Sequence, residues 1–164
     1  NLQRHFMVNS SCGVCGKATI DRVFQTVAPL DQMMTLSHAE VVGLPDILRG
    51  AQPRFAQTGG LHGAAIVDRD GALVTAAEDV GRHNAVDKVI GHCLRHENFP
   101  LDGHVLVVSS RAGFEIVQKA LMARIAAVVA VGASSSLAHR LATESRLALY
   151  SFVRGSSFNF HGQP

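Results

Sequence analysis

The sequence has few cysteines, little net charge and no long hydrophobic run, and each absence excludes a class of protein. Three cysteines, a small and odd number, argue against a secreted disulfide framework and favour a reducing cytoplasm. The formal net charge is only +2, and no lysine/arginine block predicts a nucleic-acid surface. No apolar run approaches the roughly 18 residues of a membrane span, and no signal-peptide pattern opens the chain. We therefore expect a cytoplasmic protein that binds neither nucleic acid nor membrane.

The length and composition predict one globular domain. The chain has 164 residues, of which 47% are hydrophobic and 17% charged, and a domain of this size buries roughly 70% of its unfolded surface. It contains no internal repeat and no low-complexity tract. Because it begins at Asn1 rather than at a methionine, we expect an upstream region to be missing. Within a single domain spanning 1–164, we assign residues 1–35 to a cysteine-loop region and 36–164 to an α/β/α core.

Apolar runs that alternate with helical stripes predict the fold class. The expected strands lie at residues 63–67, 72–76, 104–109, 126–131 and 147–153, with helices between them from residue 83 onward. The turn Asp70-Gly71 is typical of a hairpin between the first two strands. Strands that are apolar throughout are typical of a sheet covered on both faces. We predict a three-layer α/β/α sandwich with a mixed sheet.

Two prolines indicate where helices begin and end in the segment before the first strand. Ser37 can cap a short helix, and Pro45 can occupy the first turn of a second helix that runs to about Ala56. Pro53 is expected to end or bend that second helix.

Serine, glycine and arginine follow the carboxyl ends of the three later strands. These polar segments are residues 109–113, 132–136 and 152–157. Ligands of open α/β sheets bind at this edge, where helix starts favour anions. Arg111 and Arg154 could supply positive charge for a phosphate. Any one of these serines is typical of a simple helix cap, but three such loops together favour an anionic, nucleotide-like ligand.

A dense polar run, Glu78–Lys88, follows a predicted strand and begins a helix. His83 and Asp87 are four residues apart, so Asp87 could orient the imidazole on one helix face. The same residues could instead form a solvated first turn, with acids near the positive end of the helix. Spacing alone leaves both interpretations open.

The most informative feature is Cys12-Gly13-Val14-Cys15. Two thiols three residues apart fit a metal half-site, a dithiol redox centre or a sulfur carrier. Structural zinc needs four ligands, and this motif supplies two. His92 and His96 could complete the set, but Cys93 belongs to an apolar stripe as a core residue, which puts both histidines on a solvated face.

Two other chemistries of the cysteine pair fit the sequence less well. His38-Ala39-Glu40 matches half of the zinc-deaminase signature, but here the cysteines precede it and Ser11, not proline, stands before Cys12. A thioredoxin-type dithiol would lie inside a βαβ unit, whereas this loop precedes the regular part of the domain.

The residues around the cysteine pair fit a sulfur carrier. The neighbouring glycines and Lys17 would lower a thiol pKa toward neutrality. The resulting thiolate can accept sulfane sulfur as a persulfide and pass it on.

Several of these segments together resemble one known family. The chain is similar, over essentially its whole length, to the formate dehydrogenase accessory sulfurtransferase family, FdhD. The similarity rests on Ser10–Lys17, Thr58–His62, Glu78–Gly91, Phe114–Ala120 and Phe152–Gly155, in that order. The eleven-residue run from Glu78 is specific by itself.

This resemblance implies a cytidine-deaminase-like α/β/α fold that lacks the zinc, with no structural metal. It implies a sulfurtransferase that takes sulfur from a cysteine desulfurase and delivers it to the molybdenum cofactor, bis-molybdopterin guanine dinucleotide, which formate dehydrogenase uses. When the roles of the family's cysteine motif are assigned to the matching residues of this sequence, Cys12 bears the persulfide and Cys15 is its partner. The alternative function is a chaperone that binds the cofactor without moving sulfur. The two-fold character of the cofactor suggests a homodimer.

The resemblance also implies which residues contact the cofactor. These are Phe152, Val153, Arg154, Gly155, Ser156 and Ser157. The chain departs from the family at two points: it lacks the usual segment before the cysteine loop, and Ser157 stands where a basic residue is common. We therefore expect Arg111 and Arg154 to supply more of the positive charge.

Overall fold

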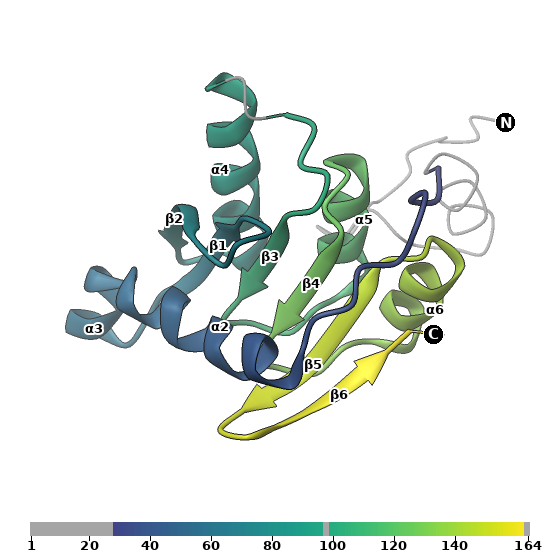
Figure 1. The fold of residues 1–164 in the computed structure, drawn as a ribbon. Helices are drawn as coiled ribbons and strands as arrows, with labels where there is room; N and C mark the ends of the chain where they lie inside the picture. Colours follow the sequence, from purple (N-terminus) through teal and green to yellow (C-terminus); the bar gives the residue numbers. More distant parts are fainter. Residues whose placement is uncertain (1–27, 97–98, 163–164) are drawn as a thin grey trace, which may run out of the picture.

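The computed structural model describes residues 28–96 and 99–162 (Figure 1). The elements are, in chain order, α2 (His38–Gly50), α3 (Pro53–Thr58), β1 (His62–Val67), β2 (Leu73–Asp79), α4 (Arg82–Arg95), β3 (Val105–Val108), α5 (Phe114–Met122), β4 (Ala127–Ala130), α6 (Ser136–Glu144), β5 (Ala148–Arg154) and β6 (Ser157–His161). The predictions for Cys12 and Cys15 lie outside the described residues.

The described strands form one mixed sheet in the order β2-β1-β3-β4-β5-β6. Strands β3, β4 and β5 run parallel, whereas β1 pairs antiparallel with both β2 and β3, and β6 pairs antiparallel with β5. The β1–β2 connection is the predicted turn: Asp68 Oδ1 accepts hydrogen bonds from the amides of Asp70 and Ala72, at 3.0 and 2.8 Å. Gly71 takes the positive φ of +83° that the turn requires. The prediction of a mixed sheet is confirmed.

Helices cover both faces of this sheet. Leu106 and Val108 of β3 point into a hydrophobic cluster shared with α4, α5 and α6. Val105 and Val107 point the other way, into a cluster shared with α2. Because successive side chains of a strand face opposite sides, burial on both faces requires every residue to be apolar. The predicted three-layer α/β/α sandwich is confirmed.

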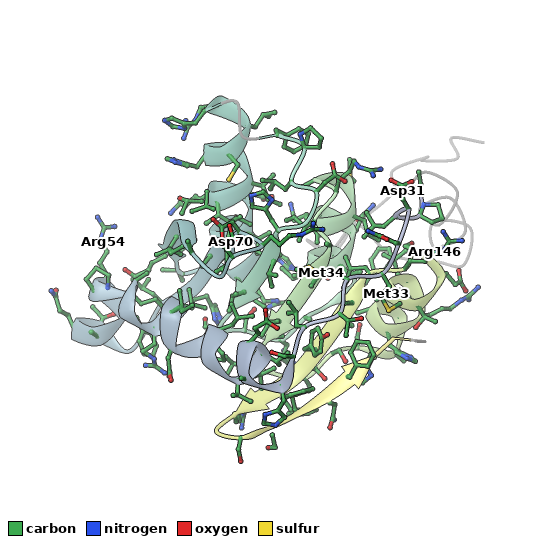
Figure 2. All side chains as sticks on the ribbon, viewed as in Figure 1. Asp31, Met33, Met34, Arg54, Asp70 and Arg146 are labelled. Carbon is green, nitrogen blue, oxygen red and sulfur yellow. The ribbon has the colours of Figure 1, made fainter. Side chains whose placement is uncertain are left out.

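The stretch before α2 is fastened to the sheet and to the end of α6. Met33 and Met34 pack against the cluster on the α2 face, and Arg146 Nη1 donates to the carbonyl of Asp31 at 3.1 Å (Figure 2). Leu36 N donates to the hydroxyl of Tyr150 at 3.2 Å. These contacts fix the chain where it enters α2.

The two prolines act differently from the prediction. Pro45 lies inside α2, which starts at a capping box formed by Ser37 and Glu40 and continues to Gly50. A proline there loses one backbone hydrogen bond, but the helix persists because it buries one face on the sheet. Pro53 begins α3 instead of ending a helix, since the first helical position needs no N–H donor.

Candidate functional site

The loops after the parallel strands meet at one edge of the sheet, as predicted. Gly132 N donates to the carbonyl of Ser110 at 3.1 Å, and Phe152 N donates to the carbonyl of Gly132 at 2.9 Å. At Gly132 a Cβ would lie 2.9 Å from Arg111 N, so only glycine permits this approach. The three polar segments therefore form one continuous rim.

The first cavity at this rim opens on the α2 face and has a volume of about 580 Å³. The rim contributes Ser109, Val153, Arg154 and Gly155, and the rest of the lining comes from α2, from the segment that runs from Gln52 to His62, and from Val131 after β4. Arg154 Nε donates to the carbonyl of Val131 at 3.1 Å, which fixes the guanidinium at the cavity. This arrangement can hold an anionic group against an otherwise mixed polar and apolar wall.

A buried amide lies in the wall of this first cavity. Gln52 is only 3% exposed, and its Nε2 has no hydrogen-bond partner among the described residues. Its side chain packs on Gly63, where a Cβ would lie 2.4 Å from Gln52 Cδ. Buried donors are normally paired, so this one is suited to an acceptor atom of a ligand. Nothing in the local sequence pattern marks Gln52, and sequence reasoning missed it.

Phe152, which precedes Val153 of the first cavity in the chain, has an unusual backbone conformation. Its φ is +54°, and the pairing of β5 with β6 is irregular between Ser151 and Arg154. A bulky residue in the left-handed region is strained, and such strain often lies at binding sites. Phe152 is 45% exposed.

The other predicted contact residues occupy the turn and the start of β6. Ser156 and Ser157 are exposed. The carbonyl of Ser156 lies 2.9 Å from His38 Nε2, and Ser157 Oγ donates to the carbonyl of Arg154 at 3.3 Å. They shape the β5–β6 turn that holds Arg154.

Arg111 does not line the first cavity. It lines a second cavity, of about 480 Å³, on the face covered by α4, α5 and α6. The residues around it include Arg82, Ser134 and Ser135. The structure therefore brings Ser109 and Arg154 together and separates them from Arg111, although all three lie on the same rim.

Four of the charged side chains in the run Glu78–Lys88 have structural partners. Glu78 caps α3, because its carboxylate accepts from the amides of Arg54 and Phe55 at 3.0 and 2.6 Å. Lys88 bonds Asp79 at 2.6 Å. Together with the Gly81 amide and the Asn84 side chain, this bond lowers the pKa of Asp79 to about 2.

The pairing of His83 with Asp87, one of the two interpretations that spacing leaves open, does not form. Asp87 Oδ1 bonds Lys119 Nζ of α5 at 2.5 Å. His83 Nε2 instead lies 3.7 Å from Glu115 Oε2 and makes no hydrogen bond with a described residue. Both partners come from α5, a segment that helix spacing alone could not reveal.

The candidate metal ligands also have other contacts. His92 and His96 stack on each other with ring centroids 4.1 Å apart, and Cys93 is buried in the core as predicted. Glu40 accepts the amide of Ser37 at 2.6 Å as part of the helix cap. Within residues 28–96 and 99–162, no three or more His, Cys, Asp and Glu side chains form a metal-binding group. Among the same residues, no helix has the length and apolar character needed to cross a membrane.

An open α/β sheet with polar cavities at the carboxyl ends of its parallel strands defines a ligand-binding α/β protein. Comparison with known proteins narrows this class. The family model described as the FdhD/NarQ family matches residues 1–164, and the chain belongs to that family. The resemblance seen in the sequence is thereby confirmed.

Individual relatives agree with this assignment. The chain is 49% identical over 163 residues to the sulfur carrier protein FdhD of Mycobacterium tuberculosis, covering 98% of this chain and 59% of that protein. It is 48% identical to the sulfur carrier protein FdhD of Streptomyces coelicolor, covering 98% and 58%. The crystal structure of a protein described as a formate dehydrogenase accessory protein from Desulfotalea psychrophila matches with a TM-score of 0.75 and 29% identity, over 87% of this chain and 59% of that one. The chain thus spans about three fifths of the length of these relatives.

Proposed function

We propose that this protein is a sulfur carrier that passes sulfane sulfur from a cysteine desulfurase to the bis-molybdopterin guanine dinucleotide form of the molybdenum cofactor, which a formate dehydrogenase then uses. The observation that supports this most strongly is the 48–49% identity, over 98% of the chain, to proteins named sulfur carrier protein FdhD. In this proposal the cofactor is the acceptor and cargo, not a resident group.

Cys12 is the proposed carrier. Its thiolate attacks the outer sulfur of the persulfide on the desulfurase, a new S–S bond forms on Cys12, and the donor cysteine leaves as a thiolate. No net oxidation or reduction occurs in this exchange. Lys17 and the neighbouring glycine amides favour the thiolate. Cys15 is the proposed assisting thiol: its attack on the inner sulfur of the Cys12 persulfide releases the outer sulfur to the acceptor at the sulfide level and leaves a Cys12–Cys15 disulfide, which a thiol reductant then reduces.

The first cavity is the proposed site for a guanine nucleotide arm of the cofactor. Arg154 and the Gly155 amide lie where a phosphate could bind, and the unpaired Gln52 Nε2 can donate to a polar ring atom. The exposed ring of Phe152 offers a stacking surface at the same turn. Volume, charge and an unpaired buried donor all support this fit.

The proposed partners follow from the two transfers. A cysteine desulfurase supplies the sulfur, and a formate dehydrogenase receives the matured cofactor. A cofactor with two guanine nucleotide arms is matched by two copies of one site, so we propose a homodimer.

Guanine nucleotide binding tests the proposed cofactor site. Arg154→Gln is expected to weaken the binding of GDP at least about tenfold, since an arginine–phosphate hydrogen bond contributes roughly 1.5–3 kcal/mol. Isothermal titration calorimetry measures this. Arg95→Gln is the matched control, because Arg95 is exposed in the last turn of α4 and lines neither cavity at the rim. Equal GDP affinity in Arg154→Gln and the parent protein would contradict the assignment.

A further inference from the structure

The second cavity at the rim is surrounded by the starts of three helices. It has a volume of about 480 Å³ and lies on the face of the sheet opposite α2. Its walls contain Arg82 at the start of α4, Gly113 to Glu115 at the start of α5, and Ser134 and Ser135 just before α6. The first cavity shares none of these residues.

Two arginines give this second cavity its positive charge. Neither Arg82 nor Arg111 forms an ion pair with a described residue, and the Nε of Arg82 is buried without a hydrogen-bond acceptor. The run Glu78–Lys88 therefore uses most of its charged side chains to hold the fold and leaves Arg82 at the cavity. Burying a guanidinium N–H without an acceptor is costly, and a bound anion removes that cost.

One carboxylate, Glu115, also lines the second cavity and opposes an anion there. Its Oε2 lies 3.7 Å from His83 Nε2, so the imidazole faces it from α4. At Gly113 a Cβ would lie 2.8 Å from this same oxygen, which places the carboxylate against the start of α5. The lining still holds two arginines and one acid, so its net charge is positive. Replacing Glu115 with a neutral residue therefore tests whether the bound ligand is an anion.

The backbone adds to the positive potential. The first residues of α4 and α5 follow Gly81 and Gly113, which cap these helices without a side chain. The N-terminal ends of helices bear partial positive charge and free N–H groups, which bind phosphate. Ser134 Oγ adds a hydroxyl at this wall, placed 3.2 Å from His161 Nε2. Cavity, arginines, buried donor and helix ends therefore point to the same ligand chemistry.

We propose that the second cavity binds a phosphate or diphosphate group through Arg82 and Arg111, at a site separate from the one at Arg154. The phosphate can belong to a small phosphate ester or to a nucleotide; both present the same oxygens to the arginines. The site requires neither Cys12 nor a guanine base, so it stands or fails independently of the proposed sulfur transfer.

Inorganic pyrophosphate is the probe for this site. We would titrate the ¹⁵N-labelled protein and follow the amide signals of Gly113, Glu115 and Ser135 by NMR. Saturable shifts are expected in the parent protein and in Arg154→Gln. Arg82→Gln and Arg111→Gln are expected to weaken binding at these amides at least about tenfold each, while Arg95→Gln changes nothing. Glu115→Gln removes the opposing carboxylate and is expected to tighten binding.

The controls make the outcome decisive. The increase in affinity with Glu115→Gln cannot come from damage to the fold, so it supports the site even if an arginine variant is unstable. A comparison of GDP with a diphosphate ester that lacks a base, both titrated at Gly113 in Arg154→Gln, separates the two sources: tighter binding of GDP indicates a nucleotide, and equal binding indicates a small phosphate ester. Absence of saturable shifts at these amides, or equal affinity in the parent, Arg82→Gln and Arg111→Gln, would overturn the inference.

Discussion

Replacing Cys12 with alanine is expected to abolish sulfur-dependent maturation of a formate dehydrogenase. Without the thiol, no persulfide can form on the carrier, and neither cavity at the rim can substitute for it. The measurement is formate dehydrogenase activity in cells that lack their own sulfur carrier and produce either the parent protein or Cys12→Ala. The fold should persist, because the two described core clusters consist of residues from Leu30 onward.

Cys93→Ala provides the matched cysteine control. Cys93 is buried on α4, and its burial raises the pKa of the thiol, so it stays protonated and is a poor nucleophile. Cells producing Cys93→Ala should retain formate dehydrogenase activity. Full activity with Cys12→Ala would show that the carrier is not this residue.

Leu106→Ala is expected to lower the free energy of unfolding by about 2–5 kcal/mol. Leu106 is 0% exposed in the central strand β3, between the sheet and the layer formed by α4, α5 and α6, and truncation there leaves a cavity that the rigid sheet cannot close. Urea unfolding measures the change. Leu94→Ala makes the same chemical change at a side chain that is 58% exposed on α4, and should cost less than about 1 kcal/mol. Similar losses in both variants would contradict the described core.

The layered fold could be predicted because a strand that is buried on both faces is apolar at every position, and this pattern is visible in the sequence. Val105 to Val108 are buried on every side, and no polar residue is tolerated there. The helix boundaries near the prolines could not be predicted in the same way. Whether Pro45 begins a second helix or lies inside one longer helix depends on how firmly that helix packs, which is a tertiary property that local sequence does not contain.

The site was predictable only in part, for a similar reason. The sequence places Arg111 and Arg154 at the same edge of the sheet, but the face on which each side chain lies depends on the twist and hydrogen bonds of the loops. Asp87 likewise bonds Lys119, which is 32 residues away in the sequence, and does not pair with its helix neighbour His83. Gln52 has no motif at all, and only its burial without a partner reveals it.

The most direct test of the sulfur-carrier proposal is the transfer of labelled sulfur. The protein is incubated with a cysteine desulfurase and ³⁵S-cysteine, digested without reductant, and the labelled peptide is identified. The proposal predicts label on the peptide that contains Cys12, released by dithiothreitol. An unlabelled Cys12 peptide, in protein that still binds GDP, would contradict sulfur transfer and favour a chaperone that only binds the cofactor.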